Sequence, residues 1–236
     1  MLPEYAVLFD IDGTLVSSVM VEGVLRHYSD AIRDVVGQIP KVSPGRFAGM
    51  VDPQICRILL NELGLTNDKV DYFVPKVLVR VSQLYAGTNK TIELNSGVRE
   101  LLPLLVKSPR HAVGILTGNL EQIAKEKLTR AEIVSYFSEF YCADTYFERT
   151  RLVADAVNSC VNKYSLLSSR SVMIVGDTPR DIAAANASGA TSIGIASGGF
   201  SLRQLSEVGA KQVYTNLKPT KQFLSALGFD SQHKLL

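Results

Sequence analysis

Short continuous apolar runs alternate with helical patterns along most of this 236-residue chain. The runs have the length of strands, which we expect at 5–9, 112–116, 172–175 and 192–196, with a weaker one at 212–214. A continuous run is typical of a strand that is buried on both faces of a parallel sheet. The spacing predicts intervening helices at 96–105, 120–136, 151–163, 181–188 and 202–208. This alternation predicts an α/β fold with a Rossmann-like, doubly wound, mainly parallel sheet.

One segment breaks the alternation. Between residues 16 and 89 the pattern predicts only helices, at 19–36, 53–63 and 68–85, separated by turn-rich stretches. We interpret this segment as a small all-helical cap domain inserted after the first strand, over the carboxyl edge of the sheet, where ligands bind in open α/β folds. The expected domains are a core of residues 1–15 and 90–236 and a cap of residues 16–89.

The composition excludes several classes of protein. With 46% hydrophobic residues, 20% charged residues and a net charge of +2, the chain is too apolar and too weakly charged for intrinsic disorder. No apolar run approaches the ~20 residues of a membrane span, and the scattered lysines do not indicate nucleic-acid binding. The three cysteines are far apart and the first residues lack a signal-peptide pattern. We expect a cytoplasmic protein, either a monomer or a homodimer.

Two carboxylates stand at the end of the first predicted strand, in the segment Asp10-Ile11-Asp12-Gly13-Thr14. Residues two apart in an extended chain point the same way, so both carboxylates can face one site. Two anions this close repel each other unless a cation lies between them or one is protonated. A strand-to-loop turn also explains Asp and Gly here. A calcium loop is disfavoured because an apolar strand precedes the segment.

A second polar segment, Thr117-Gly118-Asn119, follows the strand expected at 112–116 and opens a helix. Backbone N–H groups at a helix start, beside a Thr hydroxyl, form a site for an anion. Helix capping is the alternative interpretation, because Asn119 together with Gln122 fits a capping box.

The third polar segment, GDTPRD at 176–181, follows the strand expected at 172–175. Thr178 fits a helix N-cap and Pro179 the first helical position. Asp181 then lies in the first turn, where the helix dipole stabilises a carboxylate. Capping does not explain Asp177. With the two carboxylates of the first segment, this acidic pair supplies an oxygen-rich set that suits Mg²⁺, which retains waters and favours a phosphate ligand.

In combination these segments resemble the motifs of the haloacid dehalogenase superfamily of hydrolases, in its phosphatase branch. LFDIDGT at 8–14 resembles the first motif, ILTGN at 115–119 the second and GDTPRD at 176–181 the fourth. The resemblance covers most of the chain, including the inserted cap, and is greatest to phosphoglycolate phosphatase relatives. It implies a Mg²⁺-dependent phosphatase that acts on a small-molecule phosphate ester.

The resemblance also implies roles for individual residues. Asp10 is the expected nucleophile, which forms an aspartyl-phosphate, and Asp12 is the expected general acid and base. The transferring oxygens are expected to bind to Thr117 and to the N–H groups of Gly118 and Asn119. The implied magnesium ligands are Asp10, the backbone carbonyl of Asp12, Asp177 and Asp181.

The chain departs from the family at the third motif, which usually supplies a lysine, often followed by proline. No Lys-Pro occurs between the second and fourth motifs. The segment at 146–152 resembles a variant with an arginine in this place, and Arg149 aligns best, with Arg151 as the next candidate. A guanidinium can hold a phosphate oxygen and a carboxylate at once. Alternatively, both arginines are solvated and Lys163 or another cation serves.

The loop at 41–50 of the expected cap carries Arg46. Loops held over a site often select the substrate, so Arg46 is a candidate to bind a second anionic group of a substrate. A solvated connector between cap helices is an equally good interpretation of this loop. Two alternatives to a phosphatase also stay open: a phosphomutase of the same superfamily, and a catalytically silent binding or regulatory protein with the same fold.

Overall fold

The centre of the computed structural model, which describes residues 2–17, 21–43, 45–88 and 91–229, is a six-stranded sheet of order β3-β2-β1-β4-β5-β6. All neighbouring strands of this sheet are parallel. The strands are β1 (Tyr5–Phe9), β2 (His111–Leu116), β3 (Glu139–Tyr141), β4 (Val172–Gly176), β5 (Thr191–Ile195) and β6 (Gln212–Tyr214). This order confirms the predicted doubly wound α/β fold, and it places the topological switch point between β1 and β4.

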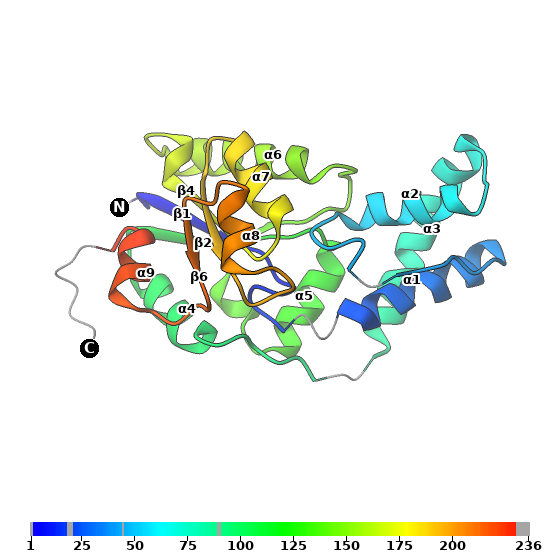
Figure 1. The fold of residues 1–236 in the computed structure, drawn as a ribbon, viewed down its shortest axis with the longest axis horizontal. Helices are drawn as coiled ribbons and strands as arrows, with labels where there is room; N and C mark the ends of the chain where they lie inside the picture. The colour runs from blue at the N-terminus through cyan, green and yellow to red at the C-terminus, as the bar shows by residue number, and fades with distance from the viewer. Residues whose placement is uncertain (1, 18–20, 44, 89–90, 230–236) are drawn as a thin grey trace.

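Helices cover both faces of the sheet (Figure 1). On β1, Val7 and Phe9 face one hydrophobic core, whereas Ala6 and Leu8 face a second one. The first core also includes α4 (Val98–Lys107), α5 (Glu121–Arg130) and α9 (Lys221–Ala226), and the second includes α6 (Arg149–Tyr164) and α7 (Pro179–Ala187). The short helix α8 (Leu202–Glu207) packs on β5 and β6. Because both faces are buried, the central strands are apolar at almost every position, with His111 at the start of β2 as an exception, which is the pattern seen in the sequence.

Three further helices lie beyond the carboxyl ends of the strands: α1 (Val21–Val36), α2 (Asp52–Glu62) and α3 (Asn67–Ala86) (Figure 1). They share a separate hydrophobic core, which Leu120 and Ile123 join from the α5 region of the sheet unit. The division into domains at 15/16 and 89/90 stays a prediction. Among the described residues, no helix is both long and apolar enough to cross a membrane.

Several predicted boundaries are wrong. The helix expected at 120–136 ends at Arg130, because Glu132 adopts a left-handed φ of 60°. The chain then forms a 3-10 turn at Val134–Tyr136 and enters β3. Strand β3 was not predicted, because its three residues are only half-buried. Helix α9 was also not predicted. Residues 19 and 20 of the helix expected at 19–36 lie outside the described residues.

The two capping predictions had different outcomes. The capping box of Asn119, the alternative interpretation of the second polar segment, is wrong, since α5 has Leu120 as its N-cap and no side-chain capping hydrogen bond. The predicted N-cap Thr178 is confirmed: its side chain accepts from the Asp181 N–H, and the Asp181 carboxylate accepts from the Thr178 N–H at 3.0 Å. This capping box fixes the start of α7 beside the sheet edge.

Candidate active site

The first acidic segment leaves the sheet at the carboxyl end of β1. The Asp10 N–H donates to the Val175 carbonyl at 2.9 Å, so the backbone of Asp10 is still held by the neighbouring strand. Gly13 follows with a φ of 82°, and a Cβ atom at this position would overlap the Asp177 carboxylate. Only glycine meets both requirements without strain. The turn therefore brings the first and fourth motifs into direct contact.

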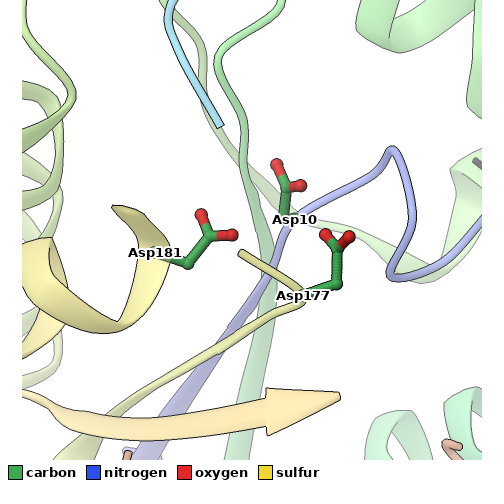
Figure 2. A group of neighbouring side chains, drawn as sticks. All are labelled: Asp10, Asp177 and Asp181. Atoms are coloured by element: carbon green, nitrogen blue, oxygen red, sulfur yellow. The ribbon is translucent and has the colours of Figure 1, made fainter. Parts of the chain in front are cut away.

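Asp10, Asp177 and Asp181 come from three places in the fold and converge on one buried point (Figure 2). One carboxylate oxygen from each lies within 4.8 Å of the others. Burial raises the pKa of Asp10 to about 7, although the nearby Arg149 lowers it. Burial, together with Asp181 and Asp10, also raises the pKa of Asp177. Three buried carboxylates at this separation repel each other unless a cation lies between them or one is protonated, and an all-oxygen donor set suits Mg²⁺.

A buried guanidinium lies beside this carboxylate cluster. Arg149 is the first residue of α6, and its Nη2 atom is 3.2 Å from Asp10 Oδ1 and forms a close ion pair with Asp181. Burial opposes its charge, but Asp181 and Asp10 raise its pKa, so it stays protonated. The structure places the other two candidates elsewhere: the side chain of Arg151 is 73% exposed and pairs with a neighbour on α6, and Lys163 pairs with Glu139 at the surface.

The second motif lies at the end of β2 and borders the same space. Thr117 is buried, and its Oγ1 accepts a hydrogen bond from the Asn119 N–H at 3.3 Å, which leaves the hydroxyl proton to donate elsewhere. The Gly118 carbonyl accepts from the Asp52 N–H at 2.7 Å, and the Asn119 side-chain oxygen accepts from Lys127 at 2.6 Å. The N–H of Asn119 is thus directed at Thr117.

Sequence reasoning missed Lys127, which is buried on α5. Its Nζ is 2.5 Å from Asp12 Oδ2, and this carboxylate, with burial opposing it, raises the pKa of the lysine. The other oxygen of Asp12, Oδ1, is buried without a hydrogen-bond partner. A signal was present: Lys127 lies at helical spacing from the buried residues Ile123 and Ala124, and so occupies the apolar face of its helix.

Two more buried polar residues connect the helices α1 and α2 to this edge of the sheet. Asp52 Oδ2 accepts from the Leu120 N–H at 2.8 Å, and burial raises the pKa of Asp52 to about 6. Burial and the adjacent Asp52 raise the pKa of the Tyr28 hydroxyl well above its usual value. Neither residue stands in a recognisable motif, because both owe their position to packing between elements distant in sequence.

The structure does not bring Arg46 to the site. Its side chain is 45% exposed, forms an ion pair with Glu62 and lies over the Phe47 ring. The cavity above Asp10 is lined by its neighbours in the same loop, from Gly45 and from Phe47 to Met50, and not by Arg46. The alternative interpretation, a surface position for this side chain, describes its observed environment.

The sheet is doubly wound, its switch point carries buried carboxylates, and helices lie over that edge. This is the edge at which α/β proteins of this class bind their ligands. Residues 7–195 match the haloacid dehalogenase-like hydrolase family, and the chain belongs to this family.

Individual relatives agree with that assignment. The chain is 26% identical to a phosphoglycolate phosphatase of Neisseria gonorrhoeae, over 92% of this chain and 94% of the relative, and 26% identical to one of Aliivibrio fischeri, over 81% and 84%. Its fold resembles that of CbbY from Rhodobacter sphaeroides in complex with phosphate, with a TM-score of 0.68, 18% identity and coverage of 97% and 100%. A hydrolase from Pseudomonas syringae gives a TM-score of 0.68 at 22% identity, with coverage of 94% and 98%.

Two adjacent glycines offer a test of the carboxylate cluster. A Cβ at Gly198 would overlap the Asp177 carboxylate, whereas a Cβ at Gly199 would meet nothing within 4 Å. We expect Gly198→Ala to rotate Asp177 away and to weaken Mg²⁺ binding by about 10- to 100-fold, while Gly199→Ala changes it by less than about twofold. Calorimetric titration of Mg²⁺ into both variants measures this difference. Equal Mg²⁺ affinities would contradict a role for Asp177 in holding the ion.

Proposed function

We propose that this protein is a Mg²⁺-dependent phosphatase that hydrolyses a small phosphomonoester through an aspartyl-phosphate on Asp10. The observation that carries the proposal is the buried cluster of Asp10, Asp177 and Asp181, with Arg149 against it. A lone structural ion pair needs one carboxylate for one guanidinium. Here three carboxylates surround one guanidinium, which leaves negative charge for a divalent cation to neutralise.

In the first half of the reaction, a carboxylate oxygen of Asp10 attacks phosphorus and the bond to the ester oxygen breaks. The departing alcohol oxygen takes a proton from Asp12. Asp12 suits this role because it lines the cavity and its buried Oδ1 has no hydrogen-bond partner, while Lys127 holds Oδ2. The carboxylate is therefore fixed through one oxygen and available through the other.

In the second half, a water molecule attacks the phosphorus of the aspartyl-phosphate. Asp12 takes the proton of this water, inorganic phosphate leaves and the Asp10 carboxylate is restored. The same residue serves as acid and then as base, so each turnover returns Asp12 to its starting protonation state. The products are one alcohol and one phosphate for each water consumed.

Two groups of the protein bind the transferring phosphoryl oxygens. Arg149 presents a charged guanidinium at Asp10. The Thr117 hydroxyl, whose oxygen already accepts from the Asn119 N–H, donates a hydrogen bond to a phosphoryl oxygen. Asp10, Asp177, Asp181 and the Asp12 backbone carbonyl would hold Mg²⁺. When bound, the ion neutralises charge between the anionic nucleophile and the anionic substrate and stabilises the transition state.

The proposal is tested with a panel of phosphate esters in Mg²⁺ and then after chelation. We expect stoichiometric release of inorganic phosphate and alcohol, and a loss of at least about 10³-fold in turnover after chelation that Mg²⁺ restores. Thermal unfolding of the same samples gives a control, since Mg²⁺ should raise the melting temperature by relieving repulsion in the cluster. An isomerised phosphate ester with little free phosphate would indicate a mutase instead.

A further inference from the structure

The cavity above Asp10 has a volume of about 360 Å³ and a lining of mixed chemistry. The acidic residues, Thr117 and Arg149 form its polar part, to which α2 contributes Asp52. The larger, mainly apolar side chains of the lining form a second part, which we call the leaving-group wall and which includes the hydroxyl-bearing Tyr28. The leaving-group wall consists of Leu25, Tyr28, Phe47, Met50, Ile55 and Phe200.

The described residues that line the cavity include one cation, Arg149, and it is engaged by Asp10 and Asp181 at the phosphoryl end. Other cations near the cavity are bound to protein partners. Lys127, which contacts the lining residues Asp12 and Asn119, pairs with Asp12. Arg46 pairs with Glu62, and Arg180 donates to the Ala48 carbonyl. The sequence of residues 18–24, SVMVEGV, contains no lysine or arginine.

Two carboxyl groups, those of Asp12 and Asp52, also line the cavity. Lys127 is already paired with Asp12, so it is not free to pair with a substrate. A carboxylate or second phosphate on the leaving group would therefore meet a mainly apolar wall and two carboxyl groups without a cation of its own. Burial of an unpaired charge in such surroundings is strongly unfavourable, and like charges add to the cost.

The volume gives a scale for the leaving group. A cavity of about 150 Å³ holds a benzene molecule, so 360 Å³ accommodates one ring together with a phosphoryl group. The loop that carries Phe47 and Met50 is held tightly against the sheet unit, because a Cβ at Gly118 would overlap the Met50 carbonyl and one at Gly49 would overlap Thr178. The part of the wall that this loop carries is therefore packed directly on the sheet unit.

We propose that the substrate is a phosphomonoester of an uncharged, largely apolar alcohol of about one ring in size, and that the leaving-group wall selects against phosphorylated carboxylic acids. This inference rests on the proposed phosphatase activity. A preference for an uncharged alcohol distinguishes this chain from relatives whose name refers to phosphoglycolate, the phosphate ester of a carboxylic acid.

The test compares three esters of matched shape in Mg²⁺: benzyl phosphate, 4-carbamoylbenzyl phosphate and 4-carboxybenzyl phosphate. The amide and the carboxylate differ in charge but not in size. We expect kcat/KM for the carboxylate ester to be at least about 100-fold below that for the amide ester, and 2-phosphoglycolate to be hydrolysed as poorly as the carboxylate ester. Equal or faster hydrolysis of the two carboxylate substrates overturns the inference and leaves the phosphatase intact.

Binding provides a readout that does not depend on turnover. Benzylphosphonate and 4-carboxybenzylphosphonate, titrated by calorimetry in Mg²⁺, should differ in affinity by at least about tenfold in favour of the uncharged ring. If no ester is hydrolysed but this preference holds, the proposed activity fails while the chemistry of the cavity stands. A preference for the carboxylate overturns the inference whatever the activity.

Variants of the wall assign the selectivity to named side chains. Phe47→Ala should lower the ratio of kcat/KM for benzyl phosphate to that for acetyl phosphate by at least about tenfold. Phe73→Ala is the matched control, because Phe73 packs on the core of α1–α3 without lining the cavity and should leave this ratio unchanged. If Phe47→Ala does not fold, Phe200→Ala makes the same test from a half-buried position on the sheet unit. An unchanged ratio in the folded variant contradicts the role of the wall.

Discussion

Asp10→Asn abolishes phosphate release, with a loss of at least about 10⁴-fold in kcat, because the amide cannot form the covalent intermediate. The variant keeps the shape of the side chain and removes one of three buried charges. Its free energy of unfolding without metal is therefore expected to equal or exceed that of the parent, since burial already disfavours the Asp10 anion. Steady-state kinetics and urea unfolding on the same preparation separate the two effects.

Asp155→Asn is the matched control for this substitution. Asp155 is a carboxylate on α6 that pairs with Arg151 at the surface, outside the cavity. We expect its activity to stay within about twofold of the parent. Residual turnover in Asp10→Asn above about 1% of the parent value would contradict covalent catalysis at this residue.

Lys127→Met destabilises the fold by about 3–5 kcal/mol, because it leaves the buried part of the Asp12 carboxylate without its cation. The loss appears as a lower midpoint in urea unfolding, and turnover falls with it because Asp12 Oδ2 is no longer held. Lys125→Met gives a control on the same helix: Lys125 is 52% exposed and pairs with Glu121, so its removal should leave the urea midpoint almost unchanged.

A double substitution tests the cause of this loss. Lys127→Met combined with Asp12→Asn removes both charges, and we expect it to recover at least half of the stability lost in Lys127→Met alone. Additive losses from the two single substitutions would contradict a direct interaction between these residues. The comparison needs only the free energies of unfolding of four proteins.

The strands and the motifs were accessible to sequence reasoning because their signals are local. A strand buried on both faces is apolar at consecutive positions, and polar residues that end such strands must meet at one edge of a parallel sheet. The strand ends placed Asp10 and Asp177, the predicted helix start placed Asp181, and the structure brings these three together. The carboxylate of Asp12, which the sequence also assigned to this set, is instead paired with Lys127. The start of α7 was equally local, because Thr178 and Asp181 cap it from within four residues.

The remaining features depend on contacts between distant segments. Lys127 reaches the site because one face of α5 is buried, and Asp52 reaches it because α2 packs on the second motif. Asn95 was missed for the same reason, although its amide donates to the carbonyls of Gly13, Thr14 and Val16 and holds the first-motif loop. Asp52 and Asn95 carry no local pattern that distinguishes them from surface residues, and the sign of burial for Lys127 is its position on the apolar face of α5.

Burial also distinguishes the two arginines that were candidates for the third motif. Arg149 and Arg151 are two residues apart on a helix, so they point in different directions, and the start of α6 decides which one faces the sheet. The helix begins at Arg149, two residues before the predicted start. Arg149 is thereby directed to Asp10 while Arg151 stays at the surface.

The most direct test of the central claim is to locate the phosphoryl group on the protein. Asp12→Asn slows hydrolysis of the intermediate, and acetyl phosphate as donor needs little proton transfer to its leaving group, so the phosphoenzyme should accumulate in Mg²⁺. After acid quench and proteolysis, mass spectrometry is expected to find one phosphoryl group, on the peptide that contains Asp10. Its absence from Asp10, or its presence on another residue while the parent enzyme turns over, would contradict the account.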